Sequence, residues 1–540
     1  MGFSKAGGSV LASTLALTMA VAPVMQSETM VEAATKVKLN KTEVDLVVGK
    51  STKIKLKGAK AVKFESSDKK IAKVTKSGKI KAKKAGSCTI KVYDSEGNVY
   101  KCKVTVTKKG QKTTDYGDID LGGMEIIIRD WWSPEDPGDP TNDYEEALND
   151  YHEEIMKKYN FKIKQVAISD WGSCIQDFIE YTALGGDDQN FVFTLRDDPA
   201  LTNAMYNGLM YDLSTLDCLD FSSEKFTRNM LHDKYSVGNS VYACYAGISE
   251  PREGVFFNKK VLKEAGIDPD DIYEAQKNGT WTWDMFEELM DKCQRDTDGD
   301  GVDDVYGLAV SDSYIVAPAV FSNGGSFIKK DKNGKFVNNV KSDETMEALK
   351  WSIDILEKYA DHRPEDAYWD YYIEDFGSGQ SAFCIDQEYQ ATGSGRLFYD
   401  YDLDLGFVMF PKGPSAKNCV SLWTNNPSVI PACYDAERAW KIAFAWNLWT
   451  EPVKGYEDYN EYAIHALQMS HLDERAISET IPMMSDPKYG KVYYHDMVPG
   501  THLGADLSWN IKPGTDLKEL VKECKATWDA YIDEVNKQIK

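Results

Sequence analysis

The hydrophobic pattern of this 540-residue chain changes its period near residue 110. Before that point, residues 36–108 alternate apolar with other side chains at period two, most clearly at residues 44–48 and 102–106. Successive side chains of a strand point to opposite faces, so this alternation predicts six or seven short strands separated by turns. We therefore expect a small all-β sandwich in the N-terminal part of the chain.

Beyond residue 123, predicted strands alternate with predicted helices. Residues 124–128 are a short apolar run, residues 144–159 carry apolar side chains at helical spacing, and residues 161–168 are typical of a second strand. A strand–helix–strand unit of this kind predicts an α/β fold. Further amphipathic helices are predicted at residues 283–293, 343–359 and 435–449.

Charge divides the chain at the same place as the hydrophobic pattern. Residues 36–110 hold 22 lysines against 6 acidic residues, a net charge of +16, whereas residues 111–540 carry a net charge of −38. Such a break indicates two domains of independent origin. A field as negative as that of the larger part repels phosphates, which argues against a nucleic acid partner.

The first 35 residues have the features of an export signal. Lys5 precedes a nearly uncharged apolar stretch at residues 10–25, and small residues near 31–34 offer a cleavage point. The stretch is too short for a membrane span, and no cysteine follows it to take a lipid anchor. We expect a secreted protein, extracellular or associated with the envelope of a Gram-positive bacterium, with a polar linker at residues 109–122.

Aromatic residues are more abundant than a core usually needs, with 13 Trp and 30 Tyr. Such rings stack well on sugars, which have an apolar C–H face and hydroxyls that carboxylates can bind. Asp130, Trp131 and Trp132 follow the first predicted strand, at the edge where open α/β sheets bind ligands, and Asp170 and Trp171 follow the second. We predict ligand contacts from all five residues. The alternatives are core packing for the first two tryptophans and a solvated turn for Asp130.

An acidic loop at residues 296–304 has the spacing of a calcium site, with carboxylates at positions 1, 3, 5 and 9. Its candidate ligands are Asp296, Asp298, Asp300, the Val302 carbonyl and Asp304. Position 12 is Gly307 instead of the bidentate glutamate of an EF-hand. We therefore expect a structural Ca²⁺ site of modest affinity, and an acidic turn without an ion is the alternative.

The ten cysteines are scattered, and no pair has the spacing of a zinc site. Cys88 and Cys102 flank the turn at residues 94–98 almost symmetrically. On antiparallel strands the two would face each other or sit one step apart, which suits a disulfide in an exported protein. Two free thiols are the alternative.

Two segments of the basic domain carry a family resemblance. Residues 64–74 (Phe-Glu-Ser-Ser-Asp-Lys-Lys-Ile-Ala-Lys-Val) and residues 78–86 (Gly-Lys-Ile-Lys-Ala-Lys-Lys-Ala-Gly) resemble a group 2 bacterial immunoglobulin-like domain. The resemblance implies an immunoglobulin-like sandwich over residues 36–108, a module that serves surface proteins as a spacer or adhesive. The lysines of this domain also predict binding to an anionic cell-wall polymer, with a spacer kept soluble by its charge as the alternative.

Five segments of the larger part together resemble the family 1 extracellular solute-binding proteins, the sugar-capturing receptors of bacterial importers. They are residues 242–259, 261–267, 280–286, 376–383 and 405–411. The resemblance implies a periplasmic-binding-protein-like fold of two α/β lobes joined by a hinge, with the ligand held between the lobes. It divides residues 123–540 into lobe 1, about 123–245 and 406–452, and lobe 2, about 246–405 and 453–540.

The same resemblance implies further ligand contacts. Tyr389 falls where the family has a stacking aromatic, and Trp423 lies near the return crossing between the lobes. Glu250 and Arg252 flank the first crossing, where an interlobe salt bridge is the alternative role. Polar neighbours of the stacking position complete the set: Asp386, Gln387 and Glu388.

Signatures of catalysis are absent from the sequence. There is no Gly-x-Ser-x-Gly, no His-Glu-x-x-His and no glycine-rich phosphate loop. We expect a monomeric, non-enzymatic protein without an organic cofactor, which captures a carbohydrate, most naturally an oligosaccharide, for the permease subunits of an ABC-type importer. The alternatives are a wall-associated glycan-binding or adhesive protein and a secreted glycan-active enzyme that uses paired carboxylates.

Overall fold

The computed structural model describes residues 37–47, 50–84, 86–107, 117, 119–140, 142–249, 252–360, 364, 366–392, 395–457 and 470–539. The predicted export signal, Glu250 and most of the predicted linker therefore lie outside the described residues. The chain separates into two compact units, Met1–Gln111 and Lys112–Lys540, and each is described by itself. Within the described residues, no helix combines the length and the apolar character that a membrane span requires.

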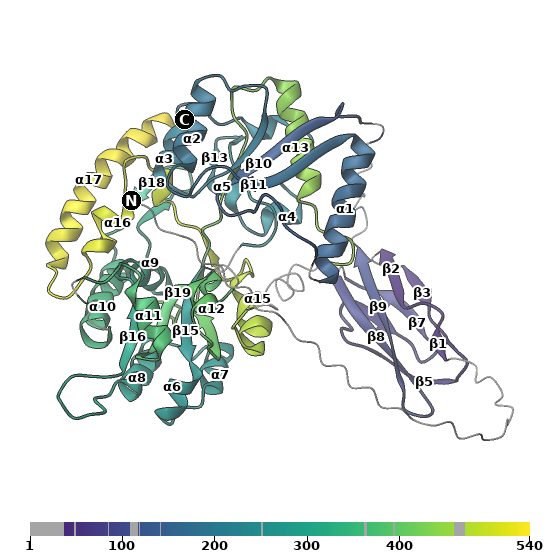
Figure 1. Cartoon of the computed structure of the whole chain (residues 1–540), viewed down its shortest axis with the longest axis horizontal. Coiled ribbons are helices and arrows are strands. Elements are labelled where there is room, and N and C mark those ends of the chain that lie inside the picture. Colours follow the sequence, from purple (N-terminus) through teal and green to yellow (C-terminus); the bar gives the residue numbers. More distant parts are fainter. Residues whose placement is uncertain are drawn as a thin grey trace, which may run out of the picture. The chain divides into compact units, whose positions relative to one another are not determined.

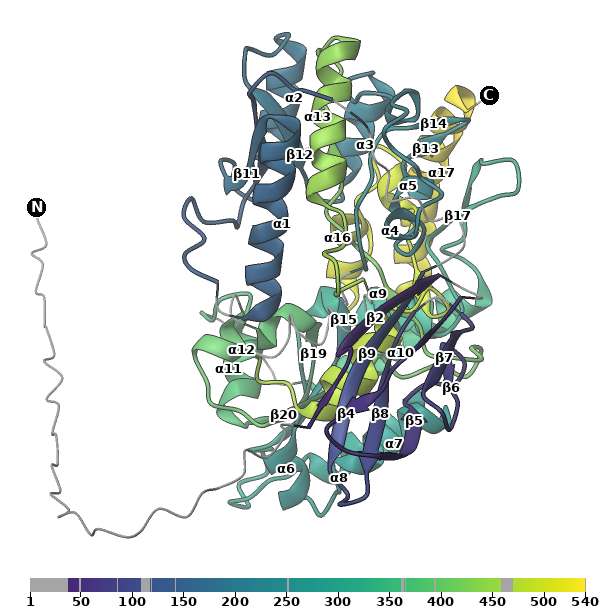
Figure 2. The ribbon, with the colours of Figure 1, turned by 90° about the vertical axis from the view of Figure 1, so that its right-hand side faces the viewer.

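The N-terminal unit is an all-β sandwich (Figure 2). Its strands are β1 (Lys38–Leu39), β2 (Glu43–Val47), β3 (Ser51–Lys53), β4 (Leu56–Lys57), β5 (Ala61–Ser66), β6 (Ala72–Val74), β7 (Lys79–Ala82), β8 (Gly86–Asp94) and β9 (Val99–Thr107). One sheet has the order β2-β9-β8-β5, a second has the order β3-β7-β6, and β1 pairs with β4. The predicted period-two strands are confirmed.

The core of this unit forms from the inward side chains of both sheets. Ile80 of β7, Ile90 of β8 and Val104 of β9 are fully buried in one cluster. Gly78 has a φ of +79° at the turn before β7, and a Cβ there would lie 2.4 Å from the Ile54 carbonyl oxygen. Only glycine fits both the positive φ and this close approach. Burial at every second residue thus explains the alternation seen in the sequence.

The sheet of lobe 1 has the strand order β11-β10-β12-β22. β10 (Met124–Asp130) pairs in parallel with β11 (Phe161–Ala167) and with β12 (Asn190–Thr194). β22 (Ser428–Val429) lies antiparallel to β12 at the sheet edge. Helix α1 (Asp143–Tyr159) joins β10 to β11, so the predicted strand–helix–strand unit is confirmed.

Helices cover both faces of the lobe 1 sheet (Figure 1). On one face, α1 and α13 (Ala436–Trp449) pack in a cluster with Val192 of β12. On the other face, α2 (Cys174–Ala183) and α3 (Pro199–Tyr206) share a cluster with Phe191 and Phe193 of the same strand. A strand buried on both faces is apolar without alternation, which explains its run of Phe-Val-Phe. The remaining elements of this part are η1 (Leu213–Thr215), α4 (Glu224–Thr227), α5 (Leu231–Lys234), β13 (Ser236–Val237) and β14 (Ser240–Val241).

The sheet of lobe 2 has the order β16-β19-β15-β20. β15 (Glu253–Asn258) lies antiparallel to both β19 (Ser381–Gln387) and β20 (Leu405–Met409), and β16 (Tyr306–Val310) pairs in parallel with β19. The surrounding elements are α6 (Lys259–Glu264), α7 (Asp270–Asn278), α8 (Trp283–Cys293), α9 (Asp312–Ser322), β17 (Ile328–Lys330), β18 (Phe336–Asn338), α10 (Asp343–Tyr359), α11 (Tyr371–Ser378), η2 (Glu388–Ala391) and α12 (Arg396–Tyr399).

The predicted lobe boundary at residue 406 is wrong, because β20 pairs with β15 over five residues and so belongs to lobe 2. The return crossing runs from Phe410 to Pro427, between β20 and β22. It lies beside the first crossing: Cys244 and Ser428 exchange two backbone hydrogen bonds of 3.2 and 2.8 Å. The two connections therefore form a paired hinge.

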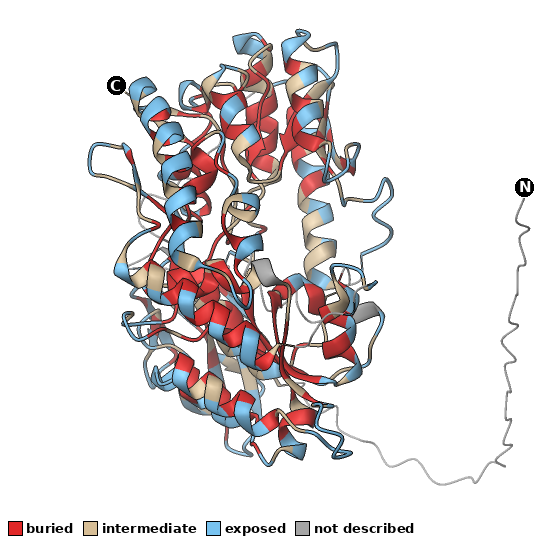
Figure 3. Cartoon of the chain, turned by 90° about the vertical axis from the view of Figure 1, so that its left-hand side faces the viewer, coloured by how far each residue is buried: buried red, intermediate tan, exposed pale blue. Residues whose placement is uncertain are grey.

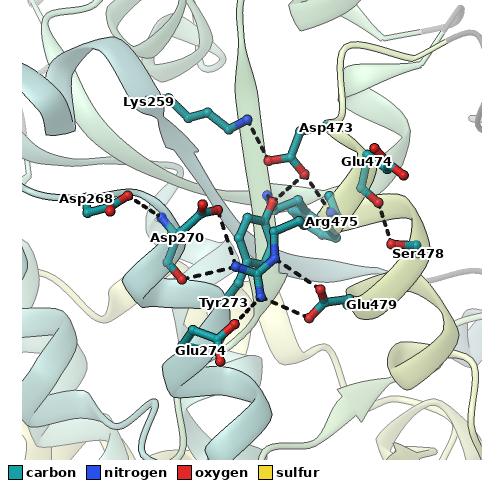
Figure 4. A network of polar contacts seen from close by, with 12 residues as sticks. Lys259, Asp268, Asp270, Tyr273, Glu274, Asp473, Glu474, Arg475, Ser478 and Glu479 are labelled. Atoms are coloured by element: carbon teal, nitrogen blue, oxygen red, sulfur yellow. Dashed lines mark hydrogen bonds and ion pairs between the residues drawn. The ribbon is translucent and has the colours of Figure 1, made fainter.

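The C-terminal segment attaches to lobe 2 through a polar network (Figure 4). Arg475 forms ion pairs with Asp270 (3.3 Å), Glu274 (2.7 Å) and Glu479 (3.1 Å). The Tyr273 hydroxyl donates to Asp473 (2.8 Å), which also pairs with Lys259 at 2.6 Å. This network fixes the chain that follows the described residue Ser470 against α6 and α7.

Helix α17 (Leu517–Gln538) closes the fold. It buries Val521, Cys524, Trp528, Ile532 and Val535 along one stripe and exposes the other face, as its colours show in Figure 3. The other elements of the segment are β21 (Ser421–Leu422), η3 (Ala476–Thr480), α15 (Ile481–Met484), β23 (Gly490–Lys491), η4 (His495–Met497), α16 (Leu503–Asp506) and η5 (Ser508–Asn510). Lys234 of lobe 1 is fully buried and forms ion pairs with Asp197 and with Asp496 (3.1 Å). The segment predicted for lobe 2 thus contacts both lobes.

Candidate functional site

Both sheets present candidate residues at their carboxyl edges. In lobe 1, β10, β11 and β12 end at Asp130, Ala167 and Thr194, and the loops that follow leave from the same edge. In lobe 2, β16, β19 and β20 run in one direction and β15 in the other, so Arg252 and Glu253 lie at the edge where β19 ends at Gln387. Open α/β sheets bind ligands at such edges.

Asp130 has a structural role in this arrangement, and its predicted ligand contact stays a prediction. Its side chain is 1% exposed. It accepts hydrogen bonds from the backbone N–H groups of Trp132 (3.2 Å) and Ser133 (3.0 Å), from the Ser133 hydroxyl and from Gln165 Nε2 (2.7 Å). These donors occupy the carboxylate, so it holds the turn that carries the two tryptophans.

The two tryptophans after β10 differ in how far they are buried. Trp131 is half-buried and packs against the core, whereas Trp132 is 50% exposed. The two rings meet edge to face, with centroids 4.8 Å apart and planes at 80°. Core packing thus describes Trp131, and Trp132 keeps a free surface.

The loop after β11 offers a second exposed ring. Trp171 is 59% exposed, and the Arg196 guanidinium lies 4.5 Å from its ring centroid, within range of a cation–π contact. Asp170 accepts a hydrogen bond from the Ser173 N–H (2.8 Å) at the start of α2. Asp170 is itself exposed, so one of its carboxylate edges can still meet solvent.

Arg252 ties the start of β15 to the return crossing. Its Nε donates to the Thr424 carbonyl (2.8 Å), and its Nη1 donates to Gln387 Oε1 (3.2 Å). Gln387 Nε2 in turn donates to Glu253 Oε1 at 3.4 Å. Arg252, Gln387 and Glu253 therefore form one chain of polar groups at the edge of the sheet.

Two buried carboxylates lie beneath this edge. Asp386 is fully buried and accepts hydrogen bonds from the Tyr372 hydroxyl (2.7 Å) and the Gln387 N–H (2.6 Å), and its burial raises its pKa to about 7. Burial also raises the pKa of Glu253. Its Oε2 is buried without a hydrogen-bond partner, which is costly unless a donor reaches it. Glu253 was not predicted from the sequence, because a single acid in an apolar strand gives little signal.

An exposed tyrosine ring and a buried glutamate lie close to Asp386 in the chain. Tyr389, in η2, is 38% exposed, and Glu388 beside it is 8% exposed. The predicted positions Asp386, Gln387, Glu388 and Tyr389 thus lie together, at and directly after the end of β19. Of the four, Tyr389 and the half-buried Gln387 are the ones open to solvent.

Lobe 2 contains an exposed aromatic pair that was not predicted from the sequence. Tyr368 and Trp369 are 84% and 60% exposed. Tyr372, three residues after Trp369, donates to Asp386 near the end of β19, so this pair lies close to the carboxyl edge. Asp370 forms an ion pair with Arg396 (2.8 Å), in the helix that follows η2. Adjacent Tyr and Trp in the polar stretch 364–371 were the available signal.

Trp423 is a core residue in this structure, and its predicted ligand contact stays a prediction. Its side chain is fully buried, and its indole N–H donates to the Met484 carbonyl at 2.8 Å. A Cβ at Gly490 would lie 2.4 Å from its ring, so the glycine makes room for it. Its polar atom is therefore already paired within the protein.

The acidic loop brings three of its predicted ligands together. Carboxylate oxygens of Asp296, Asp298 and Asp304 lie within 4.8 Å of one another, and all three residues are exposed. Backbone hydrogen bonds from Gly301 (2.8 Å) and Gly299 (2.6 Å) lower the pKa of Asp296. These groups fit a hard cation, since Ca²⁺ takes oxygen ligands at about 2.3–2.6 Å. Asp300 is outside this group.

The predicted disulfide is not formed, and both thiols are free and buried. Cys88 lies opposite Val104, and Cys102 lies opposite Ile90, so the two cysteines are diagonal neighbours. Diagonal positions are about 7–8 Å apart, beyond the usual reach of a disulfide. The alternative of two free thiols is the one the structure contains.

The fold consists of two α/β lobes and, in a separate unit of the chain, an immunoglobulin-like sandwich. Residues 222–447 match the family model of the bacterial extracellular solute-binding proteins, and residues 31–106 match that of the group 2 bacterial Ig-like domains. The two matches occur in the predicted order along the chain. No curated protein matches the chain.

Solved structures show the same fold at low identity. The GacH receptor of Streptomyces glaucescens is 14% identical with a TM-score of 0.51, and the match covers 77% of this chain and 98% of the receptor. The cyclic alpha-maltosyl-1,6-maltose binding protein of Arthrobacter globiformis is 13% identical with a TM-score of 0.53, covering 76% and 100%. RafE of Streptococcus pneumoniae is 15% identical with a TM-score of 0.51, covering 76% and 98%.

Proposed function

We propose that residues 112–540 capture a carbohydrate between the two lobes as the extracellular receptor of an ABC-type importer. The match to the solute-binding family supports the receptor class. Two neighbours in fold support the ligand class, since one was crystallised with acarbose and another is named for a cyclic maltose oligosaccharide. The ligand is bound and released without chemical change, so the protein is not an enzyme.

The placement of exposed aromatic rings carries this proposal. Seven Trp and Tyr side chains of the described residues stand out as exposed, and five belong to the loops at the two carboxyl edges. These are Trp132, Trp171, Tyr368, Trp369 and Tyr389. Exposed rings in a soluble protein cost hydration free energy unless a partner covers them, and sugar rings offer the flat apolar face that suits them. Rings from both lobes favour an oligosaccharide that spans them.

Polar groups at the same edges complete the chemistry of a sugar site. Arg252 donates hydrogen bonds, Gln387 both donates and accepts, and Glu253 has a carboxylate oxygen without a partner. A sugar hydroxyl can donate to one of these groups and accept from another. A small number of such groups beside apolar surface is the usual composition of a small-molecule site.

The paired crossings supply the means of closure. A ligand that contacts both lobes favours the closed state by its higher affinity for it. The hydrogen bonds between Cys244 and Ser428 keep the two connections together while the lobes rotate. We further propose that the acidic loop binds Ca²⁺ as a structural ion, since three carboxylates of the loop converge.

The experiment that tests this function is a glycan array probed with the full chain, followed by mass spectrometry of each bound glycan after release. We expect neutral oligosaccharides to bind and to be recovered with unchanged mass. Recovery of shortened or modified glycans would contradict the proposed receptor function and indicate a glycan-active enzyme. If no glycan binds on an array of broad coverage, the proposal that the ligand is a carbohydrate fails.

A further inference from the structure

One face of the immunoglobulin-like domain is covered by lysines. In the sheet β3-β7-β6, Lys53, Lys73, Lys79 and Lys81 are all exposed, while Ile80 between the last two is fully buried. Side chains of a strand alternate between faces, and the register places all four lysines on the outer face. We call this surface the lysine face.

The register pairs these lysines with each other. Lys53 lies directly opposite Lys79, and Lys73 lies directly opposite Lys81. Like charges directly opposite one another destabilise a sheet. Within the described part of the chain, none of these four ammonium groups has a carboxylate within ion-pair distance. The fold therefore carries an electrostatic cost at this face that neutral side chains would avoid.

In the other sheet of the same domain, several lysines lie beside acidic residues. Lys63 forms an ion pair with Glu65 at 2.6 Å, and Lys91 lies opposite the same glutamate in the register of β5 and β8. Lys103 lies opposite Glu43 in the register of β2 and β9. Lys91 also lies opposite Lys101, but two glutamates are interspersed among the lysines of that face, whereas β3, β6 and β7 contain no acidic residue. The net positive charge is therefore larger on the lysine face.

We propose that the lysine face binds a linear phosphate-bearing polymer. Four cations without carboxylate partners in one patch attract a polyanion and release its condensed counterions on binding. Alternate residues of a strand are about 7 Å apart and neighbouring strands about 5 Å apart, so several ammonium groups can reach successive phosphates of one polymer. This inference is independent of the carbohydrate site, which lies in the other unit of the chain.

The type of cation identifies the class of partner. Residues 36–110 contain 22 lysines and no arginine. The planar fork of arginine suits fixed bidentate pairing, whereas the lysine ammonium is a mobile point charge. A surface made of lysine alone therefore recognises charge density along a flexible chain. This is what a phosphodiester polymer offers.

A lipid bilayer fits this face less well. Stable attachment to a membrane surface usually combines basic residues with apolar side chains that enter the interface. The exposed large apolar residues in the described part of this domain are Val62 of β5 and Val99 of β9, which belong to the other sheet. The lysine face offers ammonium groups with small polar neighbours such as Ser51, and these suit a hydrated polymer.

The experiment measures binding of the full chain to immobilised poly(glycerol phosphate) by biolayer interferometry at 20–200 mM NaCl. The test variant is Lys53→Gln/Lys73→Gln/Lys79→Gln/Lys81→Gln. The control is Lys63→Gln/Lys91→Gln/Lys101→Gln/Lys103→Gln, which removes the same charge from the other sheet. We expect the test variant to bind at least about tenfold more weakly and the control to bind within about threefold of wild type. Wild-type affinity should fall with a log–log salt slope of about −3, as four phosphate contacts imply.

A fourth protein, in which the four residues of the lysine face become arginine, separates charge from folding, and we expect it to bind like wild type. Equal weakening of the test and control variants would show that total charge decides binding and would overturn the role of this face. Absence of wild-type binding, or wild-type binding that ignores salt, would overturn the proposal. So would tighter binding to vesicles of phosphatidylglycerol and phosphatidylcholine than to the polymer, which would make the face a membrane-docking surface.

Discussion

Asn425 Nδ2 donates a hydrogen bond to the Ser249 hydroxyl over 2.9 Å, and both side chains are buried. The two residues belong to different crossings between the lobes, so this bond joins the two connections of the hinge. Arg252 adds a second link, to the Thr424 carbonyl. Any rotation of the lobes must therefore bend both connections as a pair.

The buried hinge bond should contribute measurably to stability. Ser249→Ala removes the acceptor of the Asn425 amide and should lower the stability of the solute-binding unit by about 1 kcal/mol. Differential scanning calorimetry of the full chain would record this as a lower unfolding temperature. Ser222→Ala, which removes an exposed hydrogen bond to Asp220, is the control and should leave that temperature unchanged. Equal effects of the two substitutions would show that the hinge bond adds nothing beyond a surface contact.

The exposed tryptophans of the two edges should bind ligand. Trp132→Ala and Trp369→Ala, one from each lobe, should each weaken binding of the oligosaccharide at least about fivefold, a loss near 1 kcal/mol, because each removes a stacking surface. Isothermal titration calorimetry measures this directly. Tyr531→Ala is the control, since this ring is exposed beside Asn203 and Tyr206, away from the edges. Wild-type affinity in both tryptophan variants would remove the rings from the site.

Asp386 should make stability depend on pH. Its pKa of about 7 lies above the ordinary value of 3.8, so the folded state holds a proton that the unfolded state has lost between these values. Its contribution is fully present below about pH 4 and is lost as the pH rises through about 7, at about 1 kcal/mol per pH unit. Asp386→Asn should therefore show a smaller fall in unfolding temperature between pH 5 and 7.5 than wild type.

The exposed Asp354 of α10 provides the control for this titration. Asp354→Asn should keep the wild-type pH dependence, because it removes a carboxylate from the exposed face of α10 and leaves Asp386 in place. If Asp386→Asn and wild type lose stability in parallel between pH 5 and 7.5, Asp386 is ionised over this range and the assignment of the buried proton fails.

Calcium should stabilise the solute-binding unit through the acidic loop. At ten times its dissociation constant the ion should add about 1.4 kcal/mol, so chelation should lower the unfolding temperature. Asp296→Asn should abolish this response. Asp331→Asn, in another turn whose aspartate accepts backbone N–H bonds, is the matched control and should retain it. A calcium response that survives Asp296→Asn would place the ion elsewhere.

Periodicity predicted the fold well because its signals are local. The helix at residues 343–359 and the strand at 161–168 appear with nearly the same bounds in α10 and β11. Position after a strand also predicted the edge at which Trp132 and Trp171 lie. What local patterns miss is pairing between distant segments, and the lobe boundary was misplaced because β20 pairs with β15, some 150 residues earlier.

The roles of single side chains depended on partners that the sequence does not place. Trp423 is buried by Met484 and Gly490, about 60 residues further along, so its aromatic character alone could not separate core from ligand contact. Asp130 looks like a sugar-binding carboxylate until Gln165 and the turn after it occupy its oxygens. Glu253 is the opposite case. Its sequence position gives no sign of a binding role, and only the folded structure shows that its Oε2 is buried without a hydrogen-bond partner.

The central claim is that this protein binds an oligosaccharide in a single site and leaves it intact. Isothermal titration calorimetry of the full chain with the oligosaccharides selected by the glycan array tests it most directly, with the titrated ligand recovered and weighed by mass spectrometry. We predict one saturable site per chain, a negative heat-capacity change from burial of the aromatic rings, and a ligand of unchanged mass. Heat from continuous turnover, or no saturable binding of any selected oligosaccharide, would contradict the account.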